Sequence, residues 1–150
     1  MWDLRSGRQL GEPLEGHTGD VMAVACTEVD GVPVAVSAGN DGTVRVWDLR
    51  SGRQVGEPFT GHARKGTVVA CTELDGGPVA VSVGVGDGRV RLWDLSGRGE
   101  HGGCLAGPAV HTEAITCTVL DDGTPIAVTT AIDGTVRLGT SPPGARSAAR

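Results

Sequence analysis

The chain has 150 residues and a net charge of −5, with 25 glycines, 8 prolines, three tryptophans and one phenylalanine. This length fits one ordinary domain, and an acidic chain without a basic stripe argues against nucleic acid or an anionic membrane as the partner. No apolar run reaches the roughly 18 residues of a membrane span, and no signal-peptide core follows Met1. We therefore expect a cytoplasmic setting. Lysine occurs only as Lys65, beside many arginines, a bias typical of GC-rich bacterial genomes.

Apolar runs alternate with turn residues along the chain. Residues 8–14 predict a lone outer strand, because they repeat a later segment. Asp30-Gly31 favours a hairpin turn, and the Gly-Asn-Asp-Gly run at 39–42 favours a second tight turn. The predicted strands of the first full unit are 20–28, 34–37, 43–47 and 53–59. Links this short leave no room for helical crossovers, so the four strands should form an antiparallel sheet.

An internal repeat organises the chain. Trp2-Asp3 recurs as Trp47-Asp48 and as Trp93-Asp94, at spacings of 45 and 46 residues. Only three of sixteen positions differ between residues 2–17 and 47–62. A small sheet that recurs can bury both faces by stacking on its copies around an axis. The repeat predicts such sheets at about 20–59, 67–107 and 114–139.

The Gly-His pair at Gly16-His17 and Gly61-His62, followed by Trp-Asp at this period, resembles the signature of WD40 repeats. The resemblance extends over residues 1–140. It implies an all-β fold of β-propeller blades, each a four-stranded antiparallel sheet. Propellers typically have four to eight blades, so about three blades imply an open or incomplete propeller. Residues 141–150 have the composition of a disordered tail.

In WD40 proteins a His, a Ser or Thr, an Asp and a Trp often form a hydrogen-bonded network within a blade. The resemblance implies such structural tetrads here. The matching residues are His17, Ser37, Asp41 and Trp47, then His62, Ser82, Asp87 and Trp93, and finally His111, Thr129 and Asp133. Gly139 stands where the third tryptophan would be. Losing a buried tryptophan typically costs about 3–5 kcal/mol, so the third blade should be the weakest.

The same residue types also suggest a catalytic triad, but the pattern argues against one. The set recurs in every period, whereas one active site needs one set. Ser37 and Ser82 lack the first glycine of a G-x-S-x-G nucleophile elbow. The Gly-rich run at 84–88 precedes a strand, so no helix N-terminus is there to hold a phosphate. No C-x-x-C pair and no calcium-loop spacing occurs. We expect no catalytic residue, no cofactor and no metal.

The resemblance implies binding, with the blades as a platform for protein partners. The expected surface comprises the loops before the first strand and between the second and third strands of each blade: 15–20, 39–42, 60–67, 84–88, 107–114 and 131–134. Arg64 and Lys65 place positive charge in one of these loops. We hypothesise that they help to select an acidic partner.

Three interpretations remain open. The chain could be a fragment of a larger propeller-containing regulatory or signalling protein. It could instead close a six-blade propeller as a homodimer, with the N-terminal strand of one chain completing the last blade of the other. An enzyme or lectin on a propeller frame is the third interpretation, and the scarcity of aromatic residues disfavours it.

Overall fold

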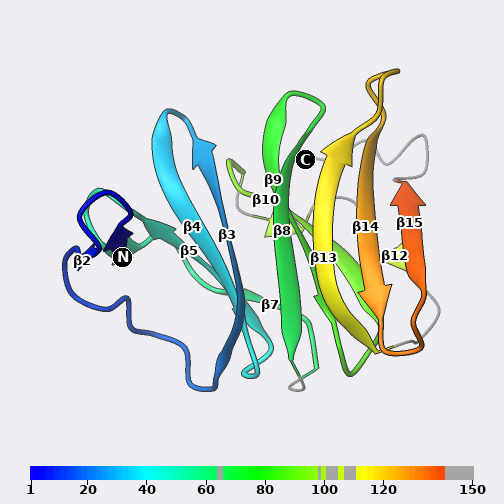
Figure 1. The fold of residues 1–150 in the computed structure, drawn as a ribbon, viewed down its shortest axis with the longest axis horizontal. Helices are drawn as coiled ribbons and strands as arrows, with labels where there is room; N and C mark the ends of the chain where they lie inside the picture. The colour runs from blue at the N-terminus through cyan, green and yellow to red at the C-terminus, as the bar shows by residue number, and fades with distance from the viewer. Residues whose placement is uncertain (64–65, 98, 101–104, 107–110, 141–150) are drawn as a thin grey trace.

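The computed structural model describes residues 1–63, 66–97, 99–100, 105–106 and 111–140. Every regular element in this part of the chain is a β-strand, and the strands form antiparallel sheets (Figure 1). The all-β prediction is therefore confirmed. Among the described residues, no helix has the length and apolar character needed to cross a membrane. The predicted tail at 141–150 lies outside the described residues.

Four sheets follow one another along the described part of the chain. The N-terminal hairpin consists of β1 (Trp2–Asp3) and β2 (Arg8–Gln9). The first sheet contains β3 (Val21–Val29), β4 (Val32–Gly39), β5 (Thr43–Asp48), β6 (Arg53–Gln54) and β7 (Phe59–Thr60). The second sheet contains β8 (Thr67–Leu74), β9 (Gly77–Gly84), β10 (Arg89–Asp94), β11 (Gly99–Glu100) and β12 (Leu105–Ala106). The third sheet contains β13 (Thr112–Val119), β14 (Pro125–Ala131) and β15 (Val136–Thr140).

Asp-Gly pairs form the turns that join the first two strands of the first and second sheets. Asp30 and Gly31 have φ angles of 50° and 76°, and Asp75 and Gly76 have angles of 52° and 80°. Two consecutive residues with positive φ define a type I′ turn, whose twist matches that of the flanking strands. The predicted hairpin turn at Asp30-Gly31 thus has its physical cause in the tolerance of these residue types for positive φ.

The outer strands differ from their prediction. Residues 53–59 predict one strand, but β6 and β7 are separate and both pair with β5. Gly56 has a φ of 71°, and Pro58 has no N–H to donate, so the Gly-Glu-Pro run interrupts the ladder. The predicted lone strand at 8–14 likewise extends only over Arg8–Gln9, and it is not lone, because it pairs with β1.

The three larger sheets stack face to face. The inner strands β3, β8 and β13 lie side by side, and the sheets fan out from them (Figure 1). The core between the first and second sheets combines valines of β4 and β5 with Val69, Ala80 and Trp93 of the second sheet. Phe59 of β7 stacks on Trp93 with ring centroids 5.0 Å apart. An outer strand of one sheet therefore packs against the tryptophan of the next.

Candidate functional site

The first predicted tetrad forms a continuous hydrogen-bonded network. His17 lies in the loop before β3, Ser37 is on β4, Asp41 is in the β4–β5 turn and Trp47 is on β5. The indole Nε1–H of Trp47 donates to Ser37 Oγ at 2.8 Å. Ser37 Oγ lies 2.7 Å from His17 Nε2, and His17 Nδ1 lies 2.9 Å from Asp41 Oδ2. The structure thus brings all four side chains together across the first sheet.

The donors in this network can be ordered by chemistry. An indole only donates and a carboxylate only accepts. If the Ser37 hydroxyl, which accepts from Trp47, donates onward to Nε2 of His17, then Nδ1 carries the imidazole proton and donates to Asp41. This assignment satisfies every member with a neutral imidazole. The chain of donors therefore runs in one direction, from the buried indole to the carboxylate in the turn.

The second tetrad repeats the arrangement on the second sheet. Trp93 Nε1–H donates to Ser82 Oγ at 2.7 Å, and Ser82 Oγ lies 2.7 Å from His62 Nε2. His62 Nδ1 lies 3.3 Å from Asp87 Oδ2. Burial lowers the pKa of His62, and the nearby Asp87 carboxylate only partly opposes this shift. The folded state therefore favours the neutral imidazole that the donor order requires.

The carboxylates also hold the loops around them. Asp41 accepts hydrogen bonds from the backbone N–H groups of Thr18 and Thr43, at 2.9 and 3.0 Å, and from the Thr43 hydroxyl at 2.7 Å. Burial alone would raise the pKa of Asp41, but these bonds and the one from His17 outweigh it and hold the pKa well below its usual range. In the second sheet, Asp87 accepts from the Ala63 N–H at 3.3 Å.

The third predicted tetrad does not form among the described residues. Asp133 instead accepts from Thr135 and from the Arg137 guanidinium, and His111 is exposed. Two substitutions account for this difference. Gly139 provides no indole, although it pairs with Ala127 as Trp93 pairs with Ala80. Ala131 replaces the glycine that precedes the turn in the other two sheets.

The sequence motif by itself does not show why this glycine is required. A Cβ added to Gly39 would lie 2.8 Å from His17 Nδ1, and one added to Gly84 would lie 2.7 Å from His62 Nδ1. Neither distance is compatible with an intact network, so this position must be glycine wherever the histidine meets the aspartate. In the sequence, this requirement is visible only as a glycine at this position of the first two repeats, Gly39 and Gly84, and an alanine, Ala131, in the third.

The Ser–His–Asp order is that of a catalytic triad, but its setting differs. Ser37 and Ser82 are buried, and each hydroxyl oxygen already accepts an indole N–H. A nucleophile must reach its substrate. Ser82 lies on the face turned toward the first sheet, and Ser37 is covered by its partners His17 and Trp47. The described residues also contain no cluster of three metal-ligating side chains. Each network ties the loop, strands and turn of its own blade together by hydrogen bonds.

These ties shape the end of the sheets at which the predicted binding loops lie. The Asn40 N–H donates to the Asp20 carbonyl at 2.8 Å, and the Val85 N–H donates to the Gly66 carbonyl at 3.0 Å. A Cβ on Gly42 would lie 2.6 Å from the His62 carbonyl oxygen, so the turn of the first sheet touches the loop of the second. Arg64, Lys65 and residues 107–110 lie outside the described residues.

The buried imidazole predicts a dependence of stability on pH. Because the pKa of His62 is lowered from 6.5 on folding, the unfolded chain binds more protons as the pH falls below that value. We expect the free energy of unfolding, measured with urea, to decrease as the pH falls below 6.5. It should decrease further below 3.8, because Asp41 and Asp87 also have lowered pKa values.

His62→Gln removes the titrating group and should flatten the decrease that begins at pH 6.5. His111→Gln changes an exposed histidine and should leave the profile unchanged. A free energy of unfolding that is constant between about pH 8 and 5 would contradict the assignment of a buried neutral imidazole.

Comparisons with known proteins agree with this geometry. The family described as "WD domain, G-beta repeat" matches residues 7–48 and 52–94, more than half of the chain. The crystal structure of RRP9 WD40 repeats has 25% sequence identity and a TM-score of 0.72, and the match covers 91% of this chain and 40% of that one. The structure of U3-55K has 24% identity and a TM-score of 0.73, with 94% and 42% covered.

The chain thus spans about two fifths of the length of these solved structures. No curated protein matches it in sequence. The family match, the structural similarity and the antiparallel sheets confirm the prediction of β-propeller blades. The chain belongs to the WD40-repeat family.

Proposed function

We propose that the chain is a scaffold that binds a protein partner at the end of the blades that carries the His–Asp networks. WD40 propellers generally serve as scaffolds for protein interactions and not as enzymes. The observation that carries the proposal is that Asp41 and Asp87 each fix a loop of their own blade through the N–H groups of Thr18 and Ala63. Loops that are held before a partner arrives lose little entropy on binding, which favours affinity.

The charge of the chain suggests the chemistry of the partner. Arg64 and Lys65 follow the loop residue Ala63 directly in the sequence, and exposed Arg89 begins the strand after the Asp87 turn. These cations stand out in a chain with a net charge of −5. We propose that they contact an acidic surface of the partner. Nucleic acid and anionic lipid are poor candidates, because the rest of the chain would repel them.

The proposal places the blades in a longer regulatory or signalling protein of the cytoplasm, in a bacterial cell. The coverage of only about two fifths of the solved propellers supports a longer parent chain. Cys26, Cys71 and Cys117 are free thiols, as is usual in a reducing compartment. Burial raises the pKa of Cys71 to about 12 and that of Cys117 to about 11, so these thiols are poor nucleophiles and serve as small core residues.

Site-specific photocrosslinking tests this function. A benzophenone amino acid replaces exposed Thr18 at the proposed binding end, or exposed Glu73 near the opposite tips as a matched control. We expect one discrete protein adduct in source cells from position 18 and none from position 73. Arg64→Glu combined with Lys65→Glu should reduce the yield of that adduct. Equal adducts from both positions, or a yield that the charge reversal does not change, would contradict the proposal.

A further inference from the structure

The two end faces of the blade stack carry the same residue positions as the two sides of the contact between the first and second blades. We define the trailing face of a blade as the one turned toward the next blade along the chain, and the leading face as the one turned toward the preceding blade. Val46 on the trailing face of the first blade is 7% exposed, whereas Leu138 at the same position of the third blade is 72% exposed. Val69 on the leading face of the second blade is 5% exposed, whereas Val24 on the first is 65% exposed. Each end face therefore exposes residues whose counterparts at the same repeat position are buried between the first and second blades.

The third blade also has a small cavity at Gly139, where the other blades have a tryptophan. A cavity of about 30 Å³ lies between the second and third blades, lined by Val79, Val81 and Leu92 on one side and by Cys117, Ala127 and Gly139 on the other. At the preceding junction the matching site is filled by Trp93, which packs against Val34, Val36 and Val46. This cavity is partly open to solvent, and its volume is smaller than the ~150 Å³ that holds a benzene ring. An indole must therefore enter from the exposed side of Gly139 and part the sheets slightly.

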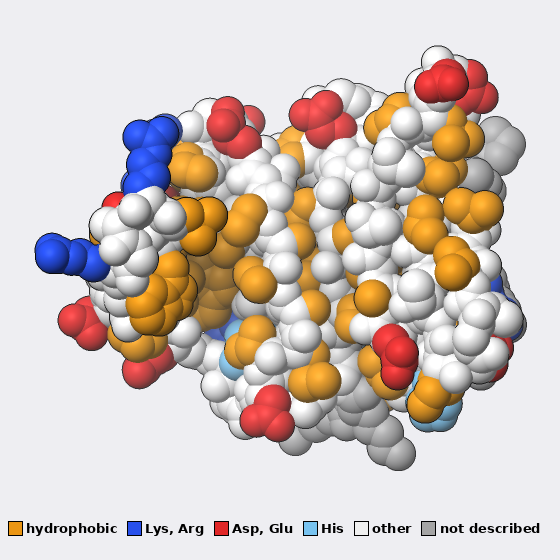
Figure 2. Space-filling model, in the orientation of Figure 1, with side chains coloured by type: hydrophobic (Ala, Val, Ile, Leu, Met, Phe, Trp, Pro, Cys, Tyr) orange, Lys and Arg blue, Asp and Glu red, His pale blue; other side chains and the backbone are white. Residues whose placement is uncertain are grey.

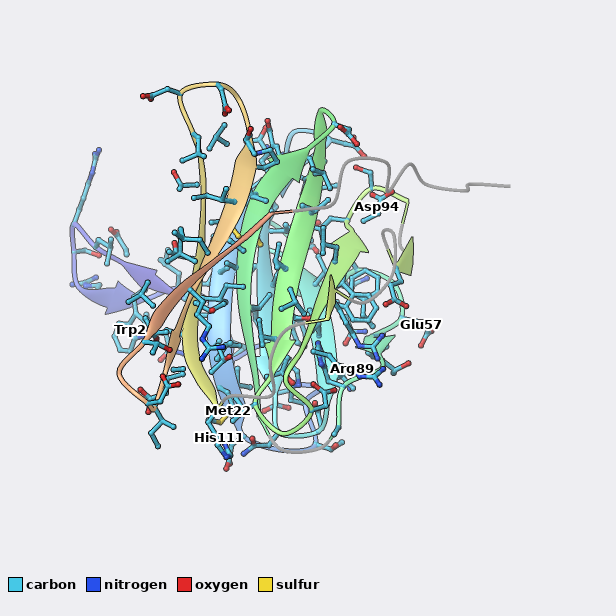
Figure 3. All side chains as sticks on the ribbon, turned by 90° about the vertical axis from the view of Figure 1, so that its right-hand side faces the viewer. Trp2, Met22, Glu57, Arg89, Asp94 and His111 are labelled. Carbon is cyan, nitrogen blue, oxygen red and sulfur yellow. The ribbon has the colours of Figure 1, made fainter. Side chains whose placement is uncertain are left out.

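At the other end of the chain, the indole of Trp2 holds the same position of the repeat and is not packed in a core. Trp2 is 67% exposed. Figure 3 shows it on the side of the molecule opposite to Asp94 and Glu57, and Figure 2 shows apolar side chains gathered at the left, where the N-terminal hairpin lies. Trp2 pairs with Gln9 in the N-terminal hairpin as Trp47 pairs with Gln54 in the first blade. The hairpin therefore already has the shape of the outer part of a blade.

The turn of this hairpin has the same internal support as its counterpart. The Asp3 carboxylate accepts the N–H groups of Arg5 and Ser6, as the Asp48 carboxylate accepts those of Arg50 and Ser51. The third sheet, in contrast, has three strands in the described part of the chain, and β15 has no outer partner there. One end thus offers an outer half-blade with a tryptophan, and the other end has an open edge and a cavity at the tryptophan position.

We propose that a second copy of the chain completes the third blade, with β1 of its N-terminal hairpin at the end of β15, β2 as the outer strand of the third sheet, and Trp2 in the cavity at Gly139. Trp2 and Gly139 hold the same position of the repeat, so β1 of the second copy replaces the last two residues of β15. The register of β7 on β5 pairs Phe59 with Val44, and the same register would place Leu14 of the second copy beside Val136. Leu138 and Val24 are then buried against each other's blades.

Two copies related by a two-fold axis form two such junctions, and their six blades close into a ring. This number lies within the four to eight blades of known propellers, and closure leaves no open edge. The proposal concerns the 150-residue chain by itself and is the alternative to the longer parent chain proposed above. It does not depend on the partner-binding function, because it concerns the faces between blades and not the loops at their ends.

Sedimentation velocity and light scattering on the full chain test the proposal. We expect a single species of about twice the 15.2 kDa chain mass. Trp2→Ala removes the inserted indole from both junctions and should weaken the dimer about 1,000-fold, because each junction loses the roughly 30-fold typical of a central interface tryptophan. Trp2 is exposed in a short hairpin, so the blades themselves should still fold. Leu138→Asp should weaken the dimer at least as much. Leu120→Asp, at an exposed loop tip outside both faces, is the matched control and should leave the Kd unchanged.

Gly139→Trp supplies the indole from the third blade itself. It should compete with Trp2 of the second copy and also weaken the dimer, while raising the Tm. In chains labelled with 5-fluorotryptophan, the ¹⁹F resonance that Trp2→Phe removes should lose its sensitivity to solvent as the dimer forms. A monomer at all concentrations, a polydisperse aggregate, or a dimer whose Kd is insensitive to Trp2→Ala and Leu138→Asp would each overturn the proposal.

Discussion

Trp93→Ala is expected to lower the free energy of unfolding by about 3–5 kcal/mol, the usual cost of truncating a buried tryptophan. The side chain is 3% exposed, stacks on Phe59 of the preceding blade and donates its N–H to Ser82. The substitution therefore removes core volume, a contact between blades and one link of a network at once. Because domains of this size are stable by only about 5–15 kcal/mol, this loss is a large share of the total and should lower the Tm by many degrees.

Two further variants separate these contributions. Trp93→Phe keeps an aromatic ring against Phe59 but loses the donor. Its cost should be close to that of one unmade hydrogen bond, about 1–3 kcal/mol, and smaller than that of Trp93→Ala. Trp2→Ala removes an indole at the same repeat position that is exposed, and should cost almost nothing at concentrations at which the chain is monomeric. Urea unfolding followed by circular dichroism measures all three. Equal losses for Trp93→Ala and Trp2→Ala would refute the packing described above.

Gly84→Ala should be nearly as damaging, although it adds only one methyl group. The new Cβ would overlap Asp87 Oδ1 and lie 2.7 Å from His62 Nδ1. The aspartate and the histidine cannot both keep their positions, so buried polar atoms of His62 and Ser82 would lose their partners. Each unsatisfied buried group costs about 1–3 kcal/mol. We therefore expect a clear loss of stability, together with loss of the His62–Asp87 contact.

Gly77→Ala is the matched control for this steric effect. Gly77 begins the same strand, β9, and its added Cβ would make an ordinary contact of 3.7 Å with the Leu74 carbonyl oxygen. A change within about 0.5 kcal/mol is expected there. Calorimetry on both variants, with the imidazole resonances of His62 followed by NMR, compares the two sites. If Gly84→Ala were as mild as Gly77→Ala, the tight fit at the network would be wrong.

Much of the fold follows from local signals in the sequence. Asp30-Gly31 specifies its turn because both residue types tolerate positive φ, and that turn sets the register of β3 on β4. The repeat gives the number and order of the sheets, because each period carries the same strand and turn pattern. The interruption between β6 and β7 differs from the single strand that the sequence predicts, because Gly56 and Pro58 break the ladder within residues 53–59.

The first two networks could be anticipated because every member stands at the expected position of the WD40 pattern. The failure of the third depends partly on the missing tryptophan at Gly139, which the motif shows, and partly on a distance, which it does not. Ala131 differs from Gly39 by one methyl group, and only the three-dimensional arrangement places that methyl beside the imidazole. The exposure of Val24 and Leu138 was equally hidden, because the same residue types are buried elsewhere in the chain.

Strand β7 pairs with β5 in the first blade, while its Phe59 packs on Trp93 of the second blade. The sequence segment that is repeated therefore does not coincide with a single blade. The nearly identical segments 2–17 and 47–62 include the end of one blade and the entry into the next. A duplication of such a segment copies residues from both sides of the contact between two blades. Such an array can therefore gain or lose whole repeats by recombination and keep matching contacts between neighbouring blades.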